Sequence, residues 1–62
     1  MKLGIYRHIE TDTFYTVIAI GKNANDCLQS LVVYQPLYDR TVTWVRPLTE
    51  FAEEGRFEFQ DL

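Results

Sequence analysis

The chain has one cysteine, Cys27, and one histidine, His8, among its 62 residues. An internal disulfide is therefore impossible, and one Cys with one His cannot form a structural zinc site of the Cys/His type. A domain of this length buries only about 60% of its unfolded surface and is marginally stable without such a staple. We therefore expect one domain over residues 1–62 with no metal and no cofactor, stabilised by an aromatic core, a partner subunit or both.

Long hydrophobic runs are also missing. The first residues, MKLGIYRH, lack the apolar stretch of a signal peptide, and no segment reaches the roughly 20 apolar residues of a membrane span. Together with a free cysteine, this favours a reducing, cytoplasmic setting. We interpret Cys27 as a small loop residue rather than a reactive thiol, because no basic residue stands beside it.

Basic residues are few, with six Lys/Arg against nine Asp/Glu and a net charge of -3. Residues 1–49 carry five basic and four acidic side chains, a net charge of +1, whereas residues 50–62 carry one and five, a net charge of -4. This balance argues against non-specific binding of nucleic acid and against an anionic membrane surface. The acidic tail is most simply a solvated face.

Short runs of β-branched and aromatic residues alternate with turn-forming residues, which is typical of antiparallel strands. The strands expected from this pattern are residues 4–9, 14–21, 30–38, 42–46 and 56–59. The Gly, Asn and Asp residues of segment 21–27 predict a loop, and residues 39–41 predict the tight turn of a hairpin. Pro36 lacks an N–H donor, so the third strand must end there or lie at an edge.

A short helical turn is expected after Pro47, which ends the fourth strand and suits a first helical position. Leu48 and Phe51 then follow at helical spacing, Thr49 is the predicted N-cap and Gly55 the predicted stop. Four to five short strands with this turn before the last strand predict an all-β fold. The architecture that fits best is a small SH3-like antiparallel barrel, with Phe57 and Phe59 facing its interior.

Three blocks of the sequence resemble a bacterial family catalogued as domain of unknown function 1653. The blocks are Gly4-Ile5-Tyr6-Arg7-His8, then Leu31-Val32-Val33-Tyr34 followed by Pro36-Leu37-Tyr38, and Trp44-Val45-Arg46-Pro47-Leu48 with Phe51. The resemblance runs from Gly4 to about Phe51 and implies an SH3-like barrel, either alone or appended to other proteins. It implies no activity. Segment 21–30 departs from the family, which often has a histidine and more acidic residues there.

Six residues are candidates for a ligand-binding site. They are Tyr6, His8, Tyr34, Tyr38, Trp44 and Arg46. Alternation along a strand puts Trp44 and Arg46 on one face, where an arginine beside a tryptophan can form a cation–π contact or a fork for a carboxylate or phosphate. Two structural alternatives remain open. Trp44 can be the core anchor of the barrel, and Arg46 can bond the carbonyls of a loop or pair with Glu50 or Glu53.

No catalytic residue is assigned. The chain has no Ser/His/Asp order, no Gly-rich phosphate loop and no metal-ligand spacing. His8 has no carboxylate at a fixed spacing, so an enzyme would require His8 and Arg46 to converge on one accessible spot.

The composition therefore favours a non-catalytic module that binds a peptide or protein partner, because Tyr, Trp and Arg dominate binding hot spots. Three other functions stay open: binding of single-stranded nucleic acid through base stacking, a homo-oligomeric structural element and, last, an enzyme that uses His8.

Overall fold

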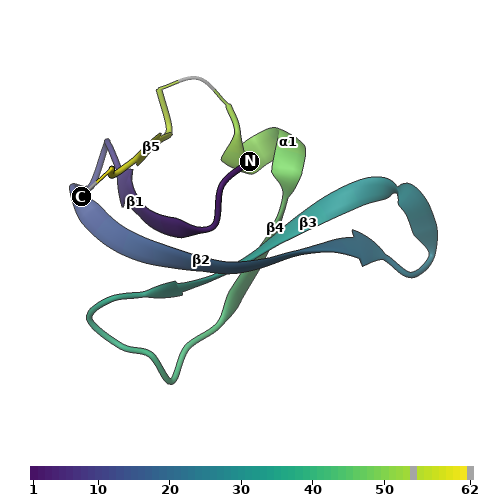
Figure 1. The fold of residues 1–62 in the computed structure, drawn as a ribbon, viewed down its shortest axis with the longest axis horizontal. Coiled ribbons are helices and arrows are strands. Elements are labelled where there is room, and N and C mark those ends of the chain that lie inside the picture. Colours follow the sequence, from purple (N-terminus) through teal and green to yellow (C-terminus); the bar gives the residue numbers. More distant parts are fainter. Residues whose placement is uncertain (54, 62) are drawn as a thin grey trace.

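Strands β1 to β4 pair antiparallel in the order of the sequence, and the last strand, β5, returns to pair with β1 (Figure 1). The computed structural model describes residues 1–53 and 55–61, which form five strands and one short helix. The sheet order is β4-β3-β2-β1-β5. The elements are β1 (Gly4–His8), β2 (Thr13–Asn23), β3 (Asp26–Pro36), β4 (Trp44–Pro47), α1 (Leu48–Phe51) and β5 (Phe57–Phe59).

One face of the bent sheet surrounds the core. Across the strands, Tyr6 lies opposite Tyr15 and Val17 lies opposite Tyr34, so the four side chains share this face. The helix α1 packs on β3 and β4, and its Phe51 belongs to the same buried core. The buried hydrophobic residues are Tyr6, Val17, Val32, Tyr34 and Phe51. This small core consists largely of aromatic rings, as the composition predicted.

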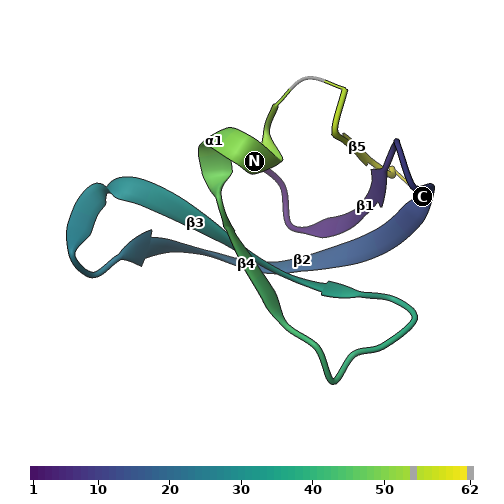
Figure 2. The same ribbon diagram turned by 180° about the vertical axis from the view of Figure 1, so that it is seen from behind.

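The helix α1, which follows the edge strand β4, contacts the other edge strand, β5, through side chains. Figure 2 shows β4 leading into α1, after which the chain crosses to β5. The rings of Phe51 and Phe57 stack with centroids 4.0 Å apart and planes 8° apart. Because no strand in the described residues joins β4 to β5, the sheet stays open. The contact between its two ends is made by this ring pair, which joins α1 to β5. The predicted all-β, antiparallel fold with a late helical turn is confirmed. Closure into a complete barrel by backbone pairing is not seen.

The loop predicted over residues 21–27 is wrong. Strand β2 continues to Asn23 and β3 begins at Asp26, so a two-residue turn joins them. The polar side chains of this segment support the turn. The N–H of Asn25 donates to Asn23 Oδ1 at 2.8 Å, and the N–H of Leu28 donates to Asp26 Oδ1 at 3.1 Å. The same Asn and Asp residues that indicated a loop therefore stabilise the end of a long hairpin.

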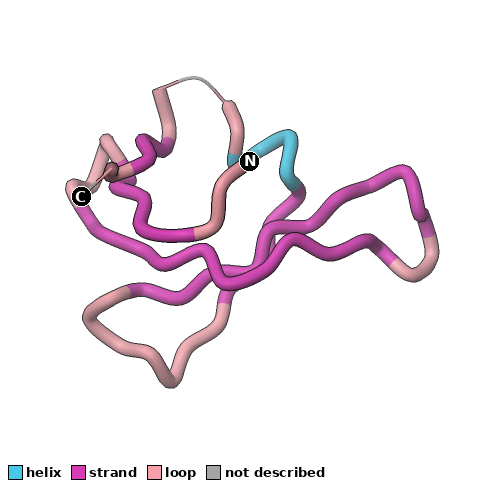
Figure 3. The backbone as a smooth tube through the Cα atoms, viewed as in Figure 1, coloured by secondary structure: helices cyan, strands magenta, loops and turns pink. Residues whose placement is uncertain are grey.

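The tight turn predicted before the fourth strand is also wrong. Strand β3 ends at Pro36, one of the two alternatives left open for this proline and two residues before the expected end of the strand. Strand β4 begins only at Trp44, so residues 37–43 form a longer loop (Figure 3). Asp39 organises this loop by accepting bonds from the N–H and the hydroxyl of Thr41, at 3.0 and 2.6 Å. These bonds lower the pKa of the Asp39 carboxyl.

The helical turn lies where it was predicted, with different ends. Pro47 occupies the N-cap position and makes no side-chain cap, and Thr49 lies inside the helix rather than at its cap. The helix ends at Ala52, whose N–H donates to the carbonyl of Leu48 at 2.8 Å. Gly55 does not stop it but adopts a positive φ of 80° in the turn that leads to β5. None of the helices in the described ranges is long and apolar enough to cross a membrane.

Candidate functional site

Trp44 and Arg46 project from the core side of β4 but at the edge of the sheet. Their cross-strand partners are Tyr34 and Val32, both buried, so the four side chains share a face. Trp44 nevertheless remains 50% exposed, because β4 is an edge strand and no later strand covers it. The core-anchor alternative for Trp44 is therefore not what the fold shows, while the predicted pairing of Trp44 and Arg46 on one face is confirmed.

The guanidinium of Arg46 is held between a tyrosine and a glutamate. Its Nε donates to the hydroxyl of Tyr34 at 3.1 Å, and this bond is the main cause of a raised Arg46 pKa. Its Nη1 lies 3.7 Å from Glu50 Oε1, one helical turn further along the chain. One of the two predicted ion pairs of Arg46 is thus present. Glu53 instead lies 3.7 Å from Arg56.

Tyr15 belongs to the same surface and was missed in the sequence. Its ring packs edge-on against Tyr34 with centroids 5.4 Å apart. Burial raises the pKa of the Tyr15 hydroxyl, the nearby hydroxyls of Tyr38 and Tyr34 raise it further, and Arg46 opposes them. Through Tyr34, the Tyr15 ring is linked to Trp44, which lies opposite Tyr34 on β4, and to Arg46, which donates to the Tyr34 hydroxyl. The signal was available in the alternation of β2, which puts Tyr15 on the face of the fully buried Val17.

Five residues from β2, β3, the following loop and β4 thus form one surface, which we name the aromatic–arginine patch. They are Tyr15, Tyr34, Tyr38, Trp44 and Arg46. Tyr38 is 75% exposed at the start of the loop. The patch combines exposed rings with a guanidinium whose orientation is fixed by a buried tyrosine.

Tyr6 and His8 lie outside this patch. Tyr6 is a core residue, with 7% of its surface exposed, and its hydroxyl donates to the carbonyl of Lys2 at 2.7 Å. His8 packs edge-on against Phe57, and its Nδ1 lies 2.9 Å from Thr11 Oγ1. Both side chains share one face, as predicted. Their contacts, however, are with residues of the core and of the neighbouring turn, and they do not form part of the patch.

The fold does not bring His8 and Arg46 together. Their strands, β1 and β4, are separated by β2 and β3 in the sheet. Within the core, His8 contacts Phe57 on one side, Phe57 contacts Tyr34, and Tyr34 bonds Arg46 on the other side. Rings of the core therefore stand between the two groups that a His8-based catalytic site would need to combine.

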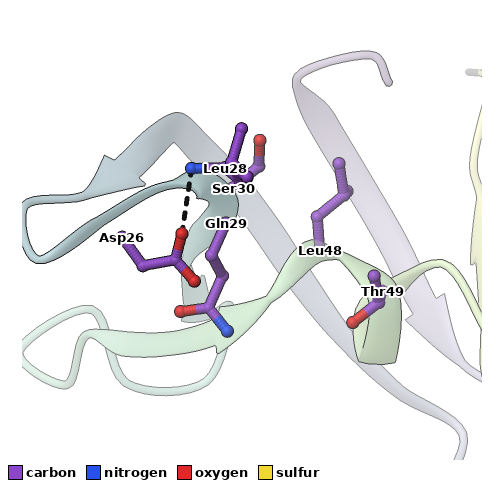
Figure 4. A pocket seen from close by; sticks show the side chains of 6 residues that line it. All are labelled: Asp26, Leu28, Gln29, Ser30, Leu48 and Thr49. Carbon is purple, nitrogen blue, oxygen red and sulfur yellow. Dashed lines mark hydrogen bonds between the residues drawn. The ribbon is translucent and has the colours of Figure 1, made fainter.

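A pocket of about 330 Å³ opens between the end of the β2–β3 hairpin and α1 (Figure 4). It is lined by Asp26, Leu28, Gln29, Ser30, Leu48 and Thr49. Its one carboxylate, Asp26, accepts the backbone N–H of Leu28 and so supports the hairpin. None of the predicted site residues lines it. In the part of the chain that the structure describes, no group of three or more His, Cys, Asp or Glu side chains is arranged to hold a metal ion.

Comparison with known proteins identifies the family. A family model described as a protein of unknown function, DUF1653, matches residues 4–60. The match extends past Phe51, where the resemblance read from the sequence ended, and so includes β5 and its two phenylalanines. No curated protein and no solved structure matches the chain. Since the model spans nearly the whole chain, the protein belongs to the DUF1653 family.

Proposed function

We propose that the chain is a non-catalytic binding module whose aromatic–arginine patch holds an extended peptide segment of a protein partner. The observation that carries this proposal is Trp44, a half-exposed tryptophan beside the fixed guanidinium of Arg46. Tryptophan, tyrosine and arginine are the residues that most often supply binding energy at interfaces. Here Tyr15, Tyr34, Trp44 and Arg46 stand on strands and need little ordering when a ligand arrives.

The edge position of β4 suits an extended ligand. Among residues 1–53 and 55–61, β4 pairs with β3 on one side and with no strand on the other. A peptide strand can add to such an edge through backbone hydrogen bonds, while alternate side chains contact the patch. Pro47 has no N–H to donate, so backbone pairing would be limited to Trp44, Val45 and Arg46.

Selection from a library of extended peptides tests the proposal, using the wild type, Trp44→Ala and Val45→Ala. Val45 is the matched control, because it is 58% exposed on the same strand but points to the opposite face. We expect Trp44→Ala to lose about tenfold or more in affinity and Val45→Ala to bind like the wild type. Circular dichroism confirms that each variant is folded. Equal retention of peptides by all three proteins contradicts the proposal.

A second candidate, a homo-oligomeric element, is favoured by the opposite face of the sheet. There Ala19, Val33 and Val45 align across β2, β3 and β4, and Phe14 remains 37% exposed. An apolar row on one side of a small sheet is a surface that a second copy can cover. Light scattering from micromolar to near-millimolar concentration tests this candidate. A constant monomer mass excludes it, whereas a dimer that Val45→Glu dissociates supports it.

A further inference from the structure

We infer that the peptide held by the aromatic–arginine patch presents a carboxylate to Arg46, and that Glu50 occupies this position in the free protein. The inference rests on the proposed binding function and names the chemistry of its ligand. It concerns the outer end of the Arg46 guanidinium, where the two Nη atoms lie.

The patch is rich in hydrogen-bond donors. Within the described residues, the indole N–H of Trp44 and the Nη2 of Arg46 have no hydrogen-bond acceptor. The hydroxyl of Tyr15, like that of any tyrosine, is protonated at neutral pH, so that it too can donate. The Nε of Arg46 is already bonded to Tyr34, which leaves the Nη1 and Nη2 atoms as a fork. A planar carboxylate matches that fork with two parallel bonds.

The contact that Glu50 makes with this fork is loose. The distance of 3.7 Å from Nη1 to Oε1 exceeds the roughly 2.7–2.9 Å of a charge-assisted hydrogen bond. The Glu50 side chain is 54% exposed, and exposed pairs of this kind are weak because water competes for both charges. A carboxylate that enters above the fork can therefore displace Glu50 at little cost.

The surroundings of the patch favour a negative ligand although the whole chain is acidic. The loop and strand that carry Tyr38 and Trp44 also contain Arg40 and Arg46 against one acid, Asp39. The Asp39 carboxylate is engaged by Thr41 within the loop. The surplus of acids lies after residue 49, so segment 37–47, which carries three of the five patch residues, has a net charge of +1.

A peptide library in two halves tests the inference. One half has amidated C-termini and the other has free C-terminal carboxyl groups. The proteins compared are the wild type, Arg46→Gln, Glu50→Gln and Glu53→Gln. Glu53→Gln is the matched control, because it removes the same charge from the next turn but its partner is Arg56.

We expect Asp and Glu, or the free carboxyl terminus, to be enriched on the wild type, and this preference to vanish on Arg46→Gln. Enrichment within the amidated half identifies a side-chain carboxylate, and enrichment confined to the other half identifies the terminal one. Glu50→Gln should bind the recovered acidic peptides about two- to fivefold more tightly, measured by Trp44 fluorescence, while Glu53→Gln should not.

The possible failures are distinguishable. Peptides that depend on Trp44 but show no acidic preference overturn the inference and leave the binding function standing. An equal gain from Glu50→Gln and Glu53→Gln shows a general charge effect and overturns the role of Glu50. If no peptide is enriched on any variant, both the binding function and the inference fall.

Discussion

The four tyrosines divide by what their hydroxyl groups contact. Tyr6 and Tyr34 are buried, and each hydroxyl is bonded inside the protein, to the carbonyl of Lys2 and to Arg46 respectively. Tyr15 is half-buried and packs against Tyr34, whereas Tyr38 is exposed to solvent in the loop after β3. The four tyrosines thus range from core residues to a solvent-exposed loop residue.

Burial of two of these hydroxyls predicts a loss of stability at alkaline pH. Burial is the largest cause of a raised pKa for both Tyr6 and Tyr15, above their ordinary value of 10.0. The folded state therefore holds their protons more tightly than the unfolded state. This contribution is complete below pH about 10 and is lost as the pH rises through the raised folded-state values.

The variant Tyr6→Phe tests this linkage. It removes one of the two titrating groups, so the free energy of unfolding should fall less steeply above pH 10 than in the wild type. At neutral pH it should cost about 0.5–1.5 kcal/mol, because the bond to the Lys2 carbonyl is lost. Urea unfolding from pH 7 to pH 11 measures both effects. Parallel profiles for the two proteins would rule out this role for Tyr6.

Part of the candidate site could be predicted at this scale. Alternation correctly placed Trp44 and Arg46 together, and Glu50 was one of the two acids expected as an ion partner of Arg46. The exposure of Trp44 could not be predicted, because it depends on which strand lies at the edge. Tyr6 was included and Tyr15 omitted for the same reason. The register between β1, β2 and β3 decides which residues of this face are covered by the core, such as Tyr6, and which stay at its exposed end, such as Tyr15. That register cannot be read from the alternation of a single strand.

Among the elements, β1 and β2 each contain a glycine, and the two have different environments. Gly4 begins β1 with a φ of 130°, and a Cβ there would lie 3.3 Å from Cε1 of Phe59 in β5. Gly21 lies in β2 with open space around it. Gly4 therefore lets β5 approach the first strand closely, whereas Gly21 has no such role.

Alanine at the two positions should have opposite effects. Gly4→Ala should destabilise the domain by about 1–3 kcal/mol, because it adds backbone strain and crowds Phe59. Gly21→Ala should be neutral or stabilising by up to about 1 kcal/mol, because it mainly restricts the unfolded chain. Thermal unfolding of both variants is the measurement. A larger loss from Gly21→Ala than from Gly4→Ala would contradict the assignment.

The elements themselves could be predicted better than their ends. The strand periodicity located all five strands and the helical turn. The ends differ at both hairpins. Asn23 and Asp26 extend one hairpin through bonds to the backbone, and Asp39 organises a longer loop in the other. Composition alone does not distinguish an Asn or Asp that loosens a loop from one that caps a turn.

For the whole molecule, the stacked rings of Phe51 and Phe57 hold together an otherwise open sheet. A double-mutant cycle with Phe51→Leu and Phe57→Leu measures this link. We expect a coupling energy of about 0.5–1.5 kcal/mol beyond the two separate losses. The cycle of Phe51→Leu with Phe14→Leu is the control, because Phe14 lies on the opposite face and should be additive. A coupling energy of equal size in both cycles would contradict a specific stabilising interaction between Phe51 and Phe57.

The all-β class could be predicted from the sequence, but the way in which its edges meet could not. The alternation of residues within each strand correctly predicted that Phe57 faces the interior. It contains no information on how separate strands are placed relative to one another. The bridge, however, is a contact between α1 and β5, two short segments whose mutual position is set by the twist of the whole sheet. The family model covers β5 together with the four earlier strands.

The pairing of β5 with β1 has a consequence for the order of folding. Strands β1 to β4 each meet a neighbour in sequence, so their pairing requires only short loops to close. Phe59 must find Tyr6 from the far end of the domain, which is the slowest kind of contact to form. On the ribosome, the first strand therefore stays half-paired and the core stays open on one side until the fifth strand has emerged.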